Sequence, residues 1–197
     1  MSRTNSQAAI CTLALLFLVQ PGYASHQVPD YPVRPAGEYA NRVTKAGLIV
    51  AVEPVEDPEQ QKTYFGSHLS SAGILPVFIV IQNTSATDAY LFDKSAVGLG
   101  DAGEDTGKGG GRTALQLGSG GLVDLVGSPI QQRENLMKKG VRSTTLSPGS
   151  SVYGFVYVPV PKHAPRKKMH LQVPLTNVQS GEIDVYKRQN QRNTRHS

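Results

Sequence analysis

The strongest constraint on the fold is a nearly unbroken run of β-branched and aromatic residues at positions 74–82, ILPVFIVIQ. These side chains suit a pleated strand better than a helix. A run without polar alternation is typical of a strand that is buried on both faces. We therefore expect residues 74–82 to form the strongest strand of the protein, followed by a turn at Asn83-Thr84-Ser85.

Several shorter segments also have the pattern of strands separated by turns. In the clearest, residues 151–160 (SVYGFVYVPV), aromatic side chains alternate and prolines mark the end. The other expected strands are 46–55, 89–92, 95–99, 144–146 and 169–173, with a last strand beginning at Ile183. About seven short strands without alternating helices predict an all-β chain, an antiparallel β-sandwich of immunoglobulin type with one or two short helices.

Two short helices are expected between the strands. The first follows Asp57, which can cap it, has Pro58 at its first position and ends at Gly66. The second spans residues 130–139, with Gly140 as its C-cap. The apolar side chains expected to fix the first helix to the sheet are Tyr64, Phe65 and Leu69.

Residues 1–24 have the pattern of a secretory signal peptide. Arg3 precedes an apolar run at 8–19, and small residues lead to an expected cleavage after Ala24. The run of about 12 residues is shorter than the roughly 20 that a membrane-spanning helix needs. The mature chain is therefore expected to be exported, most readily to a bacterial periplasm, with an extracellular or outer-membrane-associated location as the alternatives. Its single cysteine, Cys11, lies in the signal, which leaves no thiol or disulfide.

Residues 25–45 follow as a proline-rich extended arm, which could lie across a sheet edge or serve as a linker. The main domain is expected at 46–183. Between residues 25 and 183 the chain has 15 basic and 14 acidic residues, a net charge of +1. The formal charge of +5 for the whole chain therefore does not indicate a nucleic-acid partner.

The C-terminal residues 184–197 form a basic tail of questionable origin. Residues 184–189 read DVYKRQ. This is the in-frame translation of the transposon end used to prepare sequencing libraries. A natural solvated tail is the alternative. On the first interpretation the native C-terminal sequence departs from this one after about Ile183.

Three segments together resemble a loose group of exported bacterial immunoglobulin-like domains of unknown function. They are YFG at 64–66, the run from Gly73 to Ser85, and LxPG at 146–149 followed by GFVYVP at 154–159. The resemblance covers roughly residues 46–173. It implies a β-sandwich in which Asn-x-Ser ends a core strand and the last segment forms a late hairpin. It implies no activity and no catalytic residues.

Residues 98–121 are rich in glycine and are expected to form a flexible loop. Lys108 follows a glycine, but the spacing and the missing hydroxyl do not fit a phosphate-binding loop. Calcium binding by Asp101, Glu104 and Asp105 lacks the alternating spacing of a calcium loop. The histidines of the mature chain show no ligand spacing for zinc, and no serine or carboxylate pair has a catalytic pattern.

A short basic run offers the most direct contact surface. Lys162, Arg166, Lys167 and Lys168 lie between two expected strands and could touch anionic lipid head groups or an anionic cell-wall polymer. A solvated loop is the simpler interpretation.

The sequence thus predicts a non-enzymatic binding or structural domain at the cell envelope. Its partner is an envelope protein or surface, without cofactor, metal or nucleic acid. An edge strand or the arm could add to a partner's sheet. The alternative is an envelope hydrolase or a small-ligand-binding protein whose site is formed only in three dimensions.

Overall fold

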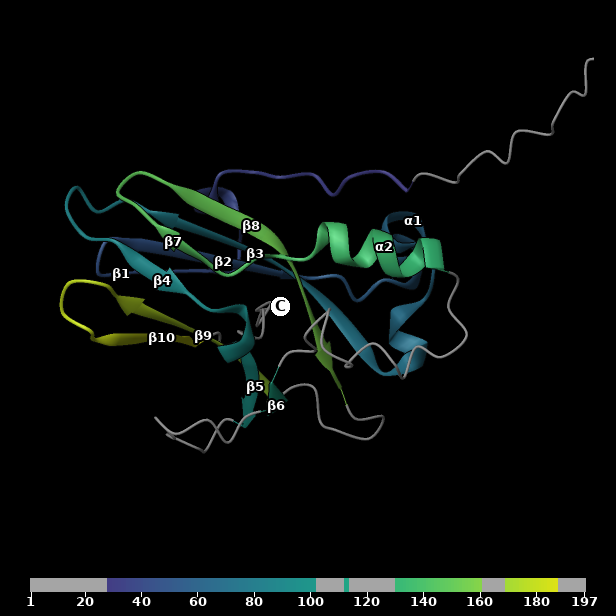
Figure 1. Ribbon diagram of the computed structural model, residues 1–197. Coiled ribbons are helices and arrows are strands. Elements are labelled where there is room, and N and C mark those ends of the chain that lie inside the picture. The colour runs from purple at the N-terminus through teal and green to yellow at the C-terminus, as the bar shows by residue number, and fades with distance from the viewer. Residues whose placement is uncertain (1–27, 102–111, 114–129, 161–168, 188–197) are drawn as a thin grey trace, which may run out of the picture.

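The computed structural model describes residues 28–101, 112–113, 130–160 and 169–187 (Figure 1). The all-β prediction is confirmed, since strands are the main regular structure of this part of the chain and form two antiparallel sheets, accompanied by two short α-helices. We call the four-stranded sheet sheet A and the larger sheet sheet B.

Sheet A has the strand order β1-β2-β3-β8. Its strands are β1 (Arg42–Lys45), β2 (Leu48–Pro54), β3 (Ile74–Asn83) and β8 (Ser151–Pro159). Ala46 and Gly47 form the two-residue turn between β1 and β2, and both have positive φ, 49° and 75°. Two successive positive φ angles give the tight turn whose twist matches paired strands.

Sheet B is built around β9 (Met169–Asn177), whose two halves pair with different strands. On one side, β4 (Tyr90–Phe92) pairs with residues 175–177 and β5 (Gly98–Asp101) pairs with residues 169–172. A short 3-10 helix, η3 (Lys94–Ala96), separates these two strands. The remaining strands are β6 (Arg112–Thr113), which pairs with β5, β7 (Thr144–Leu146), which pairs with β4, and β10 (Ile183–Lys187), which pairs with β9.

The main core lies between the two sheets. Alternate residues of β2 and β3, such as Val50 and Ile79, meet side chains from sheet B, such as Phe92 and Leu175, in one buried cluster. The expectation that the strand at 74–82 is buried on both faces is confirmed, because Phe78 and Val80 belong to a second buried cluster on the other side of sheet A.

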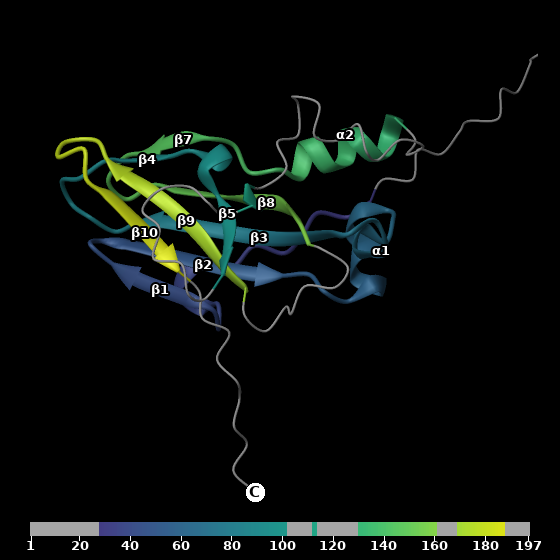
Figure 2. The same cartoon turned by 90° about the horizontal axis from the view of Figure 1, so that it is seen from below.

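This second cluster forms on the outer face of sheet A, under three covering segments. They are the arm, helix α1 (Pro58–Phe65) with the following 3-10 helix η2 (Leu69–Ala72), and helix α2 (Ile130–Lys139). Figures 1 and 2 show both α-helices at one end of the sheets and the arm running along sheet A, on the side away from the β9–β10 hairpin. Sheet A is therefore a middle layer, with sheet B on one side and the covering segments on the other.

Both helix predictions are confirmed. Asp57 caps α1 by accepting a hydrogen bond from the Glu59 N–H, and Gly66 ends the helix in the left-handed conformation. Helix α2 has the expected span, and the N–H of Gly140 donates to Leu136 O and Met137 O at its end. Phe65 and Leu69 are buried as expected, and Tyr64 packs against the same cluster.

Four predicted boundaries are wrong. The arm was expected to reach residue 45, but residues 42–45 form β1. Residues 94–96 form η3 where a strand was expected from 95 to 99, and the glycine-rich loop expected from residue 98 begins instead with β5. The strand expected at 169–173 extends to Asn177. For β1, β5 and the extension of β9, a neighbouring strand supplies hydrogen bonds that the local residue pattern does not reveal. At residues 94–96, the Asp93 side chain instead caps a helical turn by accepting from Ser95 N. The strand that begins at Ile183 runs on to Lys187, beyond the expected domain boundary.

Candidate functional site

The residues predicted to contact an anionic surface, Lys162, Arg166, Lys167 and Lys168, lie outside the described residues. So do the signal peptide, Lys108, Glu104 and Asp105, and residues 188–197 of the basic tail. The ends of the glycine-rich segment are described as β5 and β6. Asp101, predicted as a possible calcium ligand, is the last residue of β5.

Few titratable groups gather in the described part of the chain. No group of three or more His, Cys, Asp or Glu residues there could hold a metal ion. The exposed His68 ring contacts the carbonyl of Pro58 through Nδ1, and His170 lies half-buried on β9. A hollow of about 10 Å³ beside β3 has room for about one water molecule. It is lined by Glu56, Ser70, Gly73, Ile74, Leu75 and Val160. No described helix is both long and apolar enough to span a membrane.

The first interaction surface is the outer edge of sheet A, formed by β1. All four of its residues are exposed. Asn41 O accepts a hydrogen bond from Val52 N. In an antiparallel pair only every second residue bonds to the partner strand, so counting from Asn41 shows which residues of β1 bond to β2. By this register the backbone N–H and C=O groups of Arg42 and Thr44 point away from the sheet. The strand therefore offers two donors and two acceptors to a further strand.

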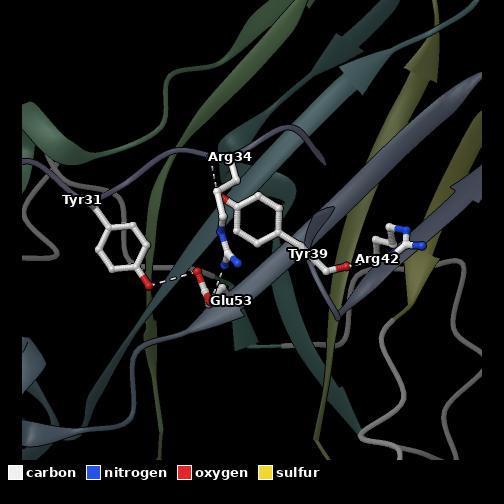
Figure 3. Close-up of polar contacts among 5 residues, drawn as sticks. All are labelled: Tyr31, Arg34, Tyr39, Arg42 and Glu53. Atoms are coloured by element: carbon white, nitrogen blue, oxygen red, sulfur yellow. Dashed lines mark hydrogen bonds and ion pairs between the residues drawn. The ribbon is translucent and has the colours of Figure 1, made fainter. Parts of the chain in front are cut away.

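The second feature is the arm, held on the outer face of sheet A by side chains (Figure 3). The hydroxyl of Tyr31 donates to Glu53 Oε2 at 3.0 Å, and Arg34 Nη2 donates to Glu53 Oε1 at 2.9 Å. The Arg34 guanidinium also lies 4.4 Å from the ring centroid of Tyr39, whose hydroxyl accepts from the Arg34 N–H. Burial raises the pKa of Tyr31, and the Glu53 charge raises it further, so Tyr31 stays neutral and donates.

The Tyr31 ring packs on an aromatic surface that we call the aromatic face. Its three members in contact with Tyr31 are Tyr64 of α1, Phe78 of β3 and Phe155 of β8, with centroids 4.9, 4.8 and 5.0 Å from the Tyr31 ring. Further along the arm, Ala36 and Tyr39 are each 1% exposed. The arm thus completes the second core, which a simple linker would not do.

Helix α2 holds the start of the arm through one lysine. Lys139 Nζ donates to Pro29 O and lies 3.6 Å from a carboxylate oxygen of Asp30. The Lys139 side chain is only 9% exposed, and this burial lowers its pKa. Since the Asp30 side chain is 96% exposed, the carbonyl is the better-placed partner.

This arrangement was not predicted from the sequence, because Glu53 lies 22 residues from Tyr31 and 19 residues from Arg34 along the chain. The sequence carries one signal for this arrangement, a spacing of three residues between the prolines of the arm. Pro29, Pro32 and Pro35 are exposed, whereas Val28 and Tyr31 are half-buried. A three-residue period is that of a polyproline II helix, which has three residues per turn.

The outer face of sheet B carries a different kind of surface. Thr145, Leu91, Thr176 and Ile183 lie opposite one another across four strands. Leu91 and Ile183 are 44% and 61% exposed. Scattered exposed apolar side chains are normal on protein surfaces.

Comparisons with known proteins add no relationship: no protein-family model, curated protein or solved structure matches this chain.

Proposed function

We propose that this protein is an exported, non-enzymatic binding module with an immunoglobulin-like β-sandwich fold, which binds an envelope protein by strand addition at β1. The strand order supports the fold assignment. Sheet A contains β2-β3-β8 and sheet B contains β7-β4-β9-β10, and the chain changes sheets between β3 and β4, β7 and β8, and β8 and β9. This order resembles that of strands A-B-E and C′-C-F-G in immunoglobulin-like domains, with β1 added at the edge of sheet A and β5 and β6 added to sheet B.

The exposed edge of β1 is the observation that carries the binding proposal. An extended segment of a partner that pairs with β1 gains backbone hydrogen bonds at Arg42 and Thr44 without any rearrangement of sheet A. Arg42 carries positive charge at the edge, which discourages indiscriminate pairing and favours a segment with an acidic residue at the matching position, whereas the charge of Lys45 is paired with Asp184 at 2.6 Å.

A proline substitution tests this proposal. In Thr44→Pro the outward N–H is lost while the hydrogen bonds between β1 and β2 remain, because Thr44 is at a non-hydrogen-bonded position of the hairpin. Thr44→Val is the matched control, since it keeps the backbone donor. Both variants and the wild type are immobilised, and the envelope proteins that they retain are quantified by mass spectrometry.

Strand addition predicts that one envelope protein is retained by the wild type and by Thr44→Val, and is lost with Thr44→Pro. Equal retention by all three forms would overturn it, provided that circular dichroism and thermal unfolding show Thr44→Pro to be folded.

We also propose that the mature chain is exported to the periplasm.

The basic residues Lys162, Arg166, Lys167 and Lys168 remain a predicted second contact, with anionic lipid. Replacing all four by glutamine should weaken binding to vesicles of anionic phospholipid in low salt and leave binding to zwitterionic vesicles unchanged. Equal binding by both forms would remove this contact from the proposal.

A further inference from the structure

The arm is bound as a ligand is bound, through a few inserted side chains. Tyr31 enters the aromatic face, its hydroxyl reaches Glu53, and Arg34 forms an ion pair with the same carboxylate. Recognition of proline-rich segments works in this way in general, with aromatic side chains receiving an extended segment that is already stiff. The chain therefore contains both a receptor surface, on the outer face of sheet A, and its ligand, the arm.

Backbone hydrogen bonding contributes little to the attachment. Among the described residues, no backbone–backbone hydrogen bond joins residues 28–38 to either sheet, and Glu38 N donates within the arm, to Pro35 O. The three prolines lack N–H donors, so the arm cannot become a ladder strand of sheet A. Release of the arm thus breaks side-chain contacts only and leaves both sheets intact.

The covalent connection between the arm and the sheets is at the C-terminal end of the arm, through Ala40 and Asn41. If cleavage follows Ala24, three residues precede Val28 in the mature chain. Eight residues, 28–35, precede the short 3-10 helix η1 (Ala36–Glu38) and span about 25 Å at the roughly 3.1 Å per residue of a polyproline II helix.

We propose that the aromatic face also accepts the arm of a second copy, so that two copies of this chain exchange arms. The contacts of Tyr31 and Arg34 with the aromatic face and Glu53, and the burial of Ala36 and Tyr39, are then made again between copies, while the Arg34–Tyr39 contacts stay within the arm. Exchange of an identical element is a low-cost route to a symmetric dimer, because no contact is lost. The surface is separate from the β1 edge, so the protein can exchange arms and still present β1 to a partner.

Site-specific cross-linking tests the exchange in the full-length chain. In a Cys11→Ser background, one variant carries Arg34→Cys and another carries Glu53→Cys. An arm with Arg34→Cys on a sheet with Glu53→Cys lacks both hydrogen bonds to Glu53, so its binding rests on the packing of Tyr31, Ala36 and Tyr39. The two are mixed, unfolded and refolded together over a range of concentrations, and treated with a short bismaleimide. A covalent dimer of the two variants forms only when the arm of one copy lies on sheet A of the other. The yield should rise as chain concentration approaches the roughly millimolar effective concentration of a tethered arm.

Two controls make the result decisive. Val178→Cys, at a position 55% exposed in the β9–β10 turn, replaces Glu53→Cys and reports random collision. The double variant Arg34→Cys/Glu53→Cys should cross-link within one chain at low concentration. Exchange predicts roughly tenfold more dimer than the Val178→Cys control, and loss of that excess when Tyr31→Ala is added to the Arg34→Cys chain.

Three outcomes would overturn the exchange. The first is cross-linking within the double variant at every concentration with none between the mixed variants. The second is no cross-link in either. The third is a dimer that survives Tyr31→Ala, which would form through another surface. None of these affects strand addition at β1, which the Thr44→Pro experiment tests independently.

Discussion

At the scale of single residues, Gly154 on β8 determines how closely the chain can cross itself. It has a φ of 149°, and a Cβ atom there would lie 2.6 Å from Val141 N and 2.7 Å from Val141 Cα. Val141 N donates to Phe155 O at this crossing, so the segment after α2 is fixed against the edge of β8. Only a glycine allows this approach.

Gly154→Ala should therefore lower the free energy of unfolding by about 3 kcal/mol, through backbone strain and overpacking. Gly149→Ala is the matched control: its φ is also positive, 75°, but a Cβ there meets no atom within 4 Å. We expect a loss of only about 1 kcal/mol for it. Urea unfolding measures both. Equal losses in the two variants would contradict the close crossing.

Asp93 makes the stability of the protein depend on pH in the acidic range. Its Oδ1 accepts hydrogen bonds from Ser95 N, Ser95 Oγ and Ser143 Oγ, and the bonds from Ser95 lower its pKa below the ordinary value of 3.8. A lowered folded-state pKa means that the stabilisation is fully present above about pH 4 and is lost as the pH falls through the folded-state pKa.

The difference in urea midpoint between wild type and Asp93→Asn should therefore be present at neutral pH and shrink at a pH well below 3.8. Unfolding curves at several pH values measure it. A difference that stays constant with pH would show that the Asp93 charge has no part in the stabilisation.

At the scale of elements, the β1–β2 hairpin contains one residue in an unfavourable backbone conformation. Ala46 has a φ of 49°, a left-handed conformation that costs a residue with a Cβ atom free energy, whereas asparagine tolerates it. Ala46→Asn should raise the free energy of unfolding by about 0.5–1 kcal/mol, as measured by urea unfolding. A destabilised variant would contradict the turn described for residues 46–47.

The elements also show what a sequence can predict. Helix α1 was predictable because its signals are local: Asp57 caps it, Pro58 starts it and Gly66 ends it. Strand β3 was predictable because its residues suit only a buried strand. Strand β1 was missed because its four residues, RVTK, are all exposed and carry no alternation. It is a strand because the turn at residues 46–47 brings it against β2.

The arm could not be predicted for a different reason. Its anchor points, Glu53, Phe78 and Phe155, lie up to about 120 residues away along the chain and converge only when sheet A has formed. The hydrogen-bond partners of buried polar residues are likewise formed only when the chain has folded. Asn83 is fully buried and donates to Asp88 O and Leu146 O, which ties the end of β3 to two other segments. The sequence suggested a turn there but not these partners.

At the scale of the whole molecule, export predicts a defined N-terminus. Expression of the full chain in a Gram-negative bacterium should yield a periplasmic protein that begins at Ser25, as identified by N-terminal sequencing. The cleavage motif would be replaced in an Ala24→Leu variant, which should remain uncleaved. Retention of the uncleaved wild-type chain in the cytoplasm would contradict the proposal.

The origin of residues 184–189 also stays a prediction. Resequencing of the locus from a library prepared without a transposon should give a different sequence after about Ile183. Recovery of DVYKRQ from such a library would show that the residues are native. The proposal for the arm uses none of these residues, whereas Lys45 at the end of β1 pairs with Asp184 and accepts a hydrogen bond from the Tyr186 hydroxyl.

The central claim is that sheet A is a middle layer, covered on its outer face by an arm that side chains alone hold in place. Hydrogen–deuterium exchange of the full chain tests it most directly. The account predicts that amides of β3 (Ile74–Asn83) exchange slowest, because that strand is paired on both edges and buried on both faces. It predicts fast exchange for the arm amides at 28–38 other than those of Arg34 and Glu38, which donate within the arm, even though the Tyr31 and Tyr39 rings are packed. Arm amides as protected as those of β3, or fast exchange in β3, would contradict it.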